Sequence, residues 1–358
     1  MKIIKVELVP VVMVREDPEW RHALSRPGGE PDVRGFIVKL IADNGLIGLG
    51  YNHGISHYGV SYGKLQAALE AYKPLLVGRD PFDTENIFIQ LESRLRGNDE
   101  ARTAIDVALH DLQAKVLGVP LYYLLGGLVR REIPIIRIVS LKEPAQMVGN
   151  ALKLVEQGYS YLKVKLNGDS EKDLSRVKEI RQAVGNKIHL IVDANQSYSP
   201  KAAISALKQM LEYGIEICEQ PVVKNDWRGL AAVTQAVDCS IEAHESAETL
   251  EDIMALVNNK ICDSINLSIN QLGGLRNAKT AAAICALGNV KLRIQAMGSR
   301  LLSAACMHLV ASTENISYAC ELGEFSRLLN DPVEGLEVEN GTLKVPLSHG
   351  VGVSLCDK

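Results

Sequence analysis

Residues 161–193 run YLKVKLNGDSEKDLSRVKEIRQAVGNKIHLIVD: an apolar stretch ending in lysines, a helical stretch, and a second apolar stretch ending in an aspartate. The same alternation recurs from about residue 132 onward, at roughly 24 to 30 residues per unit. The strand candidates are Ile133–Val139, Tyr161–Leu166, His189–Val192, Gly214–Cys218, Cys239–Ala243, Asp263–Ile269, Val290–Ile294 and Ser317–Cys320. Helical segments between them include 143–157, 171–184, 200–213, 247–258 and 275–287. This rhythm predicts an α/β fold, a closed (β/α) barrel of the TIM type. An open doubly wound sheet produces the same alternation and is the alternative.

The N-terminal third has a different texture. Residues 1–14 and 34–51 have strand patterns, and the second of these turns at Asp43-Asn44-Gly45, a strong hairpin signal. Residues 62–77 and 83–118 then show helical spacing of apolar positions. Strands followed by helices predict a separate α+β unit in front of the barrel.

Composition bounds the class of protein. The 358 residues are 47% hydrophobic and 23% charged, the balance of an ordinary globular protein. A formal net charge of −4 without a basic run argues against a nucleic-acid partner. Seven cysteines without Cys-x-x-Cys spacing indicate buried thiols in a reducing compartment. The N-terminal stretch has a strand pattern rather than the apolar core of a signal peptide, and we expect no membrane-spanning segment. We therefore expect a cytoplasmic protein.

Charged residues interrupt four successive apolar runs at the same relative place. Lys163 and Lys165 end the second run, Asp193 the third, Glu219 the fourth, and His244-Glu245 the fifth. In a barrel of this kind the chemistry gathers at the carboxyl ends of the strands. The coincidence predicts a functional site, and a structural ion-pair network at the barrel mouth is the alternative.

The residue types indicate a particular chemistry. Lys163 and Lys165 are two residues apart, so both project to the same face of their strand. Asp193 and Glu219 offer the oxygen ligands that Mg²⁺ or Mn²⁺ prefers. Such a cation can bind a substrate carboxylate and stabilise the enediolate that forms when the α-proton leaves. A lysine beside another cation has a lowered pKa and can serve as the base.

Several motifs, taken in order and spacing, resemble the mandelate racemase and muconate-lactonizing enzymes of the enolase superfamily, and the muconate-lactonizing branch most closely. They are Lys163-Val164-Lys165, Asp193-Ala194-Asn195, Glu219-Gln220-Pro221, Glu245-Ser246, Gly273-Gly274, the helix Arg102–Leu109 with Leu124-Leu125-Gly126-Gly127, and the ending Gly350-Val351-Gly352-Val353. The resemblance implies an N-terminal α+β capping domain (1–126), a barrel (127–321), and a C-terminal segment (322–358) that returns to the cap.

It also implies roles for single residues. Lys165 would be the base on one face of the substrate, Lys163 would neutralise its carboxylate, and Asp193 and Glu219 would bind the metal. Glu321, after the last strand, would orient the substrate or donate a proton, although a structural acid is an equal alternative. A basic, aromatic loop would form the mobile specificity loop over an anionic substrate; its residues are Trp20, Arg21, His22 and Arg26.

Three positions depart from the family pattern. His244 stands where an aspartate usually binds the metal, so that either imidazole replaces carboxylate, favouring Mn²⁺, Fe²⁺ or Zn²⁺, or Glu245 moves in, or the site binds metal poorly. Ser268 stands where a lysine usually serves the opposite face. Arg300 matches the histidine of the racemase branch and suits carboxylate binding rather than proton removal.

These departures separate the possible reactions. Racemisation needs a base on each face, whereas elimination from a hydroxy- or amino-acid needs only Lys165, so a dehydratase or related lyase is the first expectation. A cycloisomerase and an epimerase with another acid are the alternatives, and a silent barrel with a binding or structural role is an alternative of another class. We expect a small-molecule carboxylate as the partner, and a homo-oligomer, because barrels of this type commonly assemble.

Overall fold

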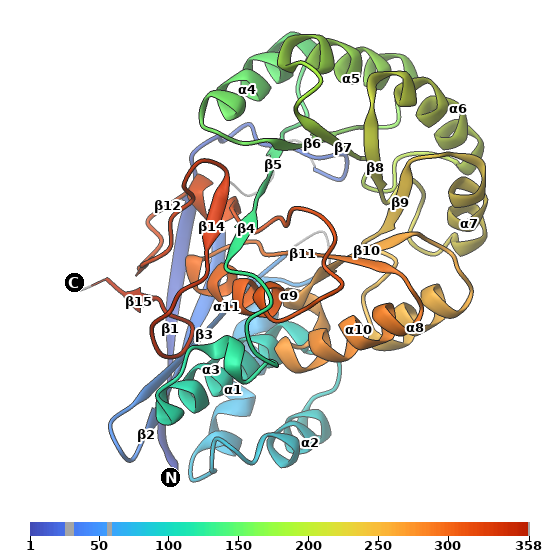
Figure 1. The fold of residues 1–358 in the computed structure, drawn as a ribbon. Helices are drawn as coiled ribbons and strands as arrows, with labels where there is room; N and C mark the ends of the chain where they lie inside the picture. Colours follow the sequence, from blue (N-terminus) through green and yellow to red (C-terminus); the bar gives the residue numbers. More distant parts are fainter. Residues whose placement is uncertain (26–31, 56–58, 357–358) are drawn as a thin grey trace.

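The segments between residues 132 and 321 form a barrel in the computed structural model, which describes residues 1–25, 32–55 and 59–356. Its strands pair in chain order and in parallel (Figure 1). They are β5 (Ile136–Val139), β6 (Tyr161–Lys165), β7 (His189–Asp193), β8 (Ile215–Glu219), β9 (Ser240–Ala243), β10 (Ser264–Ser268) and β11 (Lys291–Gln295).

The eighth predicted strand closes this sheet. Cys320 forms a parallel bridge with Ile135, and Glu321 forms one with Gln295, so the segment lies between the first and last strands. The amide of Ile136 donates to the carbonyl of Cys320 at 3.0 Å, and the amide of Ala296 donates to that of Glu321 at 3.0 Å. Closure by these bonds confirms the predicted barrel over the open sheet.

Helices surround the barrel, and most of them pack one apolar stripe against the strands (Figure 1). Ser199 illustrates how such a helix starts: its hydroxyl accepts from the Ala202 amide and Pro200 takes the first turn. The helices are α4 (Pro144–Glu156), α5 (Ser170–Val184), α6 (Pro200–Met210) with η3 (Leu211–Tyr213), α7 (Trp227–Ala236), α8 (Leu250–Asn258), α9 (Ile269–Leu272), α10 (Leu275–Leu287) and α11 (Arg300–Ala311).

The cap is an antiparallel sheet with helices against it. The predicted hairpin turns at residues 43–46, and the single helix predicted over 83–118 is broken near Gly97, whose φ of 68° no helix accommodates. The cap elements are β1 (Ile3–Arg15), β2 (Asp32–Ala42), β3 (Ile47–His53), α1 (Tyr62–Leu76), α2 (Thr84–Arg94) and α3 (Asp99–Leu117).

Helix α3 joins the cap to the barrel. A Cβ at Gly50 of β3 would lie 1.9 Å from the carbonyl oxygen of Ala104, so the glycine permits this close helix–sheet packing. On its other side α3 contacts α9 and α10: the Thr103 hydroxyl donates to the Ile269 carbonyl at 2.7 Å, and the Leu275 amide donates to Asp106 at 2.6 Å. Helix α3 therefore connects the cap directly to the second half of the barrel.

A short strand of the C-terminal segment lies against the cap sheet. Strand β12 (Leu328–Leu329) pairs antiparallel with the end of β1. The other short elements are η2 (Leu121–Tyr123), β4 (Glu132–Pro134), η4 (Glu324–Arg327), β13 (Val333–Glu334), β14 (Thr342–Lys344) and β15 (Ser354–Leu355). Within the described part of the chain, no helix combines the length and the apolar character that crossing a membrane requires.

Candidate active site

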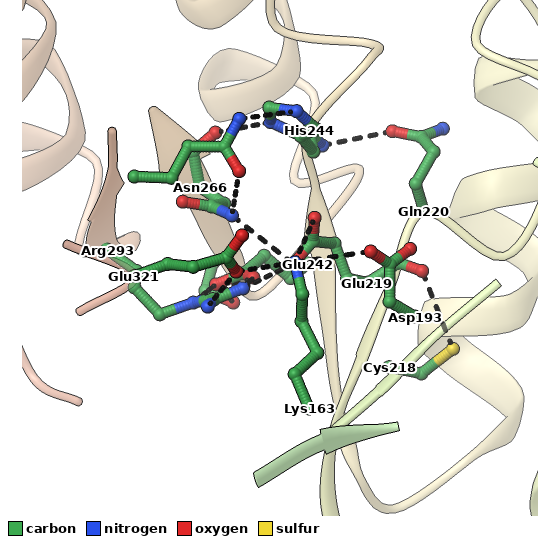
Figure 2. A network of polar contacts seen from close by, with 12 residues as sticks. Lys163, Asp193, Cys218, Glu219, Gln220, Glu242, His244, Asn266, Arg293 and Glu321 are labelled. Carbon is green, nitrogen blue, oxygen red and sulfur yellow. Dashed lines mark hydrogen bonds and ion pairs between the residues drawn. The ribbon is translucent and has the colours of Figure 1, made fainter. Parts of the chain in front are cut away.

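Lys163 lies at the centre of a buried ionic network inside the barrel (Figure 2). Its Nζ is 3.2 Å from Asp193 Oδ2, 3.1 Å from Glu219 Oε2 and 2.6 Å from Glu321 Oε2. Burial opposes the charge, but Glu219, Glu321 and Asp193 together raise the pKa of Lys163 well above its ordinary value. The three surrounding carboxylates therefore hold Lys163 in its charged form, although Arg293 opposes this.

Lys165 lies two residues further along β6, at the end of the strand. Its Nζ donates to Asp193 Oδ2 at 2.5 Å and to Asn195 Oδ1 at 2.9 Å. Asn195 has a φ of 42°, and its amide donates to Asp193 Oδ1 at 2.9 Å. A left-handed turn of this kind suits asparagine, and it brings the amide side chain back over the strand end. Asp193 and Asn195 thus hold the Lys165 ammonium in place.

Two residues that the sequence analysis passed over complete the network. Arg293 of β11 donates through NH2 to both Glu219 and Glu242, and its Nε lies 3.2 Å from Glu242 Oε1. Burial would raise the pKa of Glu219, yet Lys163 and Arg293 hold it well below its usual range. The sequence held a signal for each residue. Glu242 precedes His244 by two residues, so strand alternation places both on the same face, and Arg293 is a single charge within an apolar run.

His244 and Glu245 follow the last residue of β9 and diverge. The Nδ1 of His244 donates to the Asn266 carbonyl at 3.0 Å, and Gln295 Nε2 lies 3.0 Å from its Nε2. The Glu245 carboxylate accepts from Asn195 Nδ2 at 3.2 Å, and burial raises its pKa. Glu245 therefore turns toward the end of β7, because the alternation of a regular strand no longer applies beyond Ala243.

Two family profiles of known proteins match this chain. The profile of the mandelate racemase / muconate lactonizing enzyme N-terminal domain matches residues 22–126, and the enolase C-terminal domain-like profile matches residues 146–358.

The chain belongs to the mandelate racemase/muconate lactonizing enzyme family.

Several of its relatives in this family are named as isomerases. An L-Ala-D/L-Glu epimerase of Clostridium acetobutylicum is 32% identical over 90% of this chain and 91% of its own length. A chloromuconate cycloisomerase of Cupriavidus necator is 29% identical over 98% and 97%. The structure of a dipeptide epimerase from Enterococcus faecalis, complexed with Mg and L-Leu-L-Tyr, superposes with a TM-score of 0.94 at 31% identity, covering 99% of this chain and 100% of that one. The chain is therefore an enzyme of the enolase superfamily, and its relatives favour the isomerase alternatives over the elimination that we expected first.

The family implies a divalent metal, which the sequence analysis assigns to Asp193 and Glu219 with His244 or Glu245. Within the described residues no group of three or more His, Cys, Asp or Glu side chains is placed to hold a metal ion. Both oxygens of Asp193 and of Glu219 accept from protein donors, and the His244 ring is turned toward β10 and β11. As they are arranged, these residues do not fit a divalent ion.

Of the predicted substrate-binding residues Ser268 and Arg300, only Ser268 lies at the mouth of the barrel. Ser268 ends β10, which lies four strands from β6 and so across the barrel from Lys165, and its hydroxyl is 3.4 Å from Asn270 Oδ1. Arg300 instead engages the C-terminal segment: it pairs with Asp331 at 3.4 Å and lies over the Phe325 ring. Its contacts give no support to the predicted role in substrate binding.

The predicted specificity loop lies against the barrel. The Arg21 amide donates to Ser140 Oγ, just beyond β5, at 2.9 Å, and the Trp20 ring packs under the Arg15 guanidinium at 4.8 Å. Trp20 and Arg15 line a cavity of about 50 Å³ between the cap and the barrel, together with Gly298 and Arg327. Arg26 of this predicted loop lies outside the described residues.

Proposed function

We propose that this enzyme is a one-base isomerase of the cycloisomerase type, in which Lys165 handles the proton at the carbon next to a substrate carboxylate. The observation that carries the proposal is the asymmetry of the barrel mouth. Lys165 stands at the end of β6, and Ser268 stands across from it. A serine hydroxyl without an activating base cannot collect a proton near neutral pH, so one face is served.

The contacts of Lys165 favour the ring-closing direction. A lysine ammonium has three donors, and here Asp193 and Asn195 accept two of them. No described residue accepts the third, which can serve a substrate. When an internal carboxylate adds to a double bond conjugated with a second carboxylate, the enediolate that forms needs one proton at its α-carbon. Lys165 would deliver that proton, and the product would be an isomer of the substrate.

The substrate class follows from this chemistry. It is a small unsaturated carboxylate that carries an internal nucleophile, of the kind named for the chloromuconate cycloisomerase relatives. Elimination is the second candidate, because it also needs only Lys165 on one face. Epimerisation of dipeptides, named for other relatives, would need a proton acceptor opposite Lys165.

The sequence predicts a divalent metal, a homo-oligomer and a cytoplasmic location for this chain. The relative solved with Mg supports Mg²⁺, and His244 would favour Mn²⁺, whereas the present arrangement supplies too few ligands. That the protein forms a homo-oligomer and that it is located in the cytoplasm both stay predictions.

Proton exchange in D₂O tests the proposal. Muconate-type dicarboxylates and dipeptides are incubated with the enzyme, with and without Mg²⁺ or Mn²⁺, and followed by NMR. We expect deuterium on one face of the α-carbon of the cyclised product and no inversion of dipeptides. Lys165→Met should lower the rate by about a hundred- to ten-thousand-fold, and exposed Lys172→Met should not. Rapid dipeptide inversion that survives Ser268→Ala would overturn the one-base proposal.

A further inference from the structure

Arg293 occupies the middle of the acidic cluster. The side chain is fully buried and reaches from β11 across the barrel interior toward three carboxylates that come from different parts of the barrel wall (Figure 2). Its NH2 donates to Glu219 and Glu242, its Nε lies 3.1 Å from Glu242 Oε2, and its NH1 lies 3.5 Å from Glu321 Oε2. One fixed cation therefore gathers oxygens of three acids, which is what a bound divalent ion does in a carboxylate site.

Lys163 adds a second cation to the same cluster. Its ammonium contacts Glu219 and Glu321, which are two of the three acids that Arg293 reaches, and also Asp193. Asn266 Nδ2 adds a further donor to Glu219 Oε2 at 3.2 Å. Each Glu219 oxygen thus faces protein donors, and a metal ion could bind there only by displacing a buried cation. Displacing it would leave that cation buried without its partner, which is costly.

His244, which stands where the family usually has a third metal ligand, is held by other contacts. The Nδ1–H of His244 is used by the Asn266 carbonyl, so the proton is fixed on that nitrogen and Nε2 is left as an acceptor. Gln295 Nε2 approaches that atom at 3.0 Å, while its Oε1 faces Asn266. Turning the ring toward Glu219 would break both contacts inside a packed barrel.

We propose that Arg293 takes the place of the divalent metal in this chain, as a built-in cation that pairs with Glu219, Glu242 and Glu321. The active centre is then assembled without Mg²⁺ or Mn²⁺. Arg293 is a positioning residue here: it holds the acids that in turn hold Lys163. The inference goes beyond the proposed reaction and does not depend on which carboxylate the enzyme transforms.

Metal binding by the whole protein gives the test a readout other than turnover. Protein treated with a chelator and dialysed is titrated with Mn²⁺ by electron paramagnetic resonance and with Mg²⁺ by calorimetry. Melting temperatures are recorded with and without each ion. We expect no saturable site and no shift in melting temperature for the unmodified chain, because an ion that binds only the folded state must raise it.

Three substitutions sharpen the test. Arg293→Met removes the cation, so it should lower the melting temperature, create at least about a tenfold gain in Mn²⁺ affinity, and be rescued in part by that ion. Arg293→Lys keeps a positive charge and should gain no affinity. Arg181→Met is the matched control: this arginine is also buried, but its guanidinium donates to backbone carbonyls of residues 185, 188, 213 and 214. It should lose stability without rescue by metal.

Two outcomes would overturn the inference. One is stoichiometric Mn²⁺ binding by the unmodified chain that Asp193→Asn or Glu219→Gln abolishes. The other is an Arg293→Met protein that folds and gains no metal affinity, since Arg293 would then be an ordinary ion-pair partner. If Arg293→Met does not fold, the titration of the unmodified chain and of Arg293→Lys decides. A failure to find any substrate affects the proposed reaction alone, because none of these measurements requires turnover.

Discussion

The two halves of the barrel use the same strand-end positions for different purposes. Strands β6 to β8 present Lys165, Asp193 and Glu219, groups that can move a proton or carry charge. Strands β10 and β11 present Ser268 and Gln295, which are neutral at every pH of interest. The fold positions both sets equally well, so the difference lies in side-chain chemistry alone. The ends of β6 to β8 carry groups that can transfer a proton or hold charge. The ends of β10 and β11 carry neutral groups that form hydrogen bonds.

The largest expected effect tests the charged half. Glu219→Gln removes the acid that Lys163 and Arg293 share, leaving two buried cations short of a partner. We expect the free energy of unfolding to fall by about 3 to 5 kcal/mol, measured by urea denaturation in the presence of a chelator. Glu216→Gln on the same strand is the control. Its contact with His189 is partly exposed and should contribute about 1 kcal/mol or less. Equal losses for the two variants would contradict the central role of Glu219.

Lowering the pH should destabilise the packing around helix α11, which follows β11. His308 lies on this helix; its Nε2 donates to the Val351 carbonyl at 3.1 Å, and burial lowers its pKa from 6.5 to about 4. The folded protein keeps this ring neutral, while the unfolded chain takes up a proton below pH 6.5. Stability is therefore lost as the pH falls from 6.5 to 4, by about 3 kcal/mol. His308→Gln should reduce this slope, and exposed His349→Gln should not. An unchanged slope in His308→Gln would contradict the assignment.

Substitution of Arg300 distinguishes a structural role of this side chain from a role in substrate binding. Arg300→Met removes the contacts with Asp331 and the Phe325 ring, which hold the start of α11 to the C-terminal segment. We expect a loss of about 1 kcal/mol in thermal or urea unfolding, because the side chain is partly exposed. Substrate KM should stay unchanged in NMR assays. A tenfold rise in KM would restore the role in carboxylate binding that the sequence suggested.

The smallest expected effect lies opposite Lys165. Ser268→Ala removes one hydroxyl whose nearest partner, Asn270 Oδ1, is 3.4 Å away. The rate of proton exchange should change by no more than about twofold, or about 0.4 kcal/mol in the barrier. A loss of a hundredfold or more would show that Ser268 acts on the second face, and the two halves would then share the chemistry.

Local patterns in the sequence determined much of this enzyme. The period of strands and helices predicted the barrel, because apolar spacing follows the geometry of each element. Lys163, Lys165, Asp193 and Glu219 were predicted to meet because parallel strands end at one mouth, and the structure brings them into direct contact. The losses at His244 and Ser268 were also visible, since each is a substitution within a recognisable motif.

Only the tertiary structure decided how these charges are balanced. Arg293 and Glu242 are single charged residues within apolar runs, and nothing in their local sequence says that they reach each other and Glu219 across the barrel. The turn of His244 toward Asn266 and of Glu245 toward Asn195 likewise depends on neighbours from other strands. A buried charge is tolerated only with its partners, and those partners are distant in the chain, so the final arrangement is a property of the closed barrel.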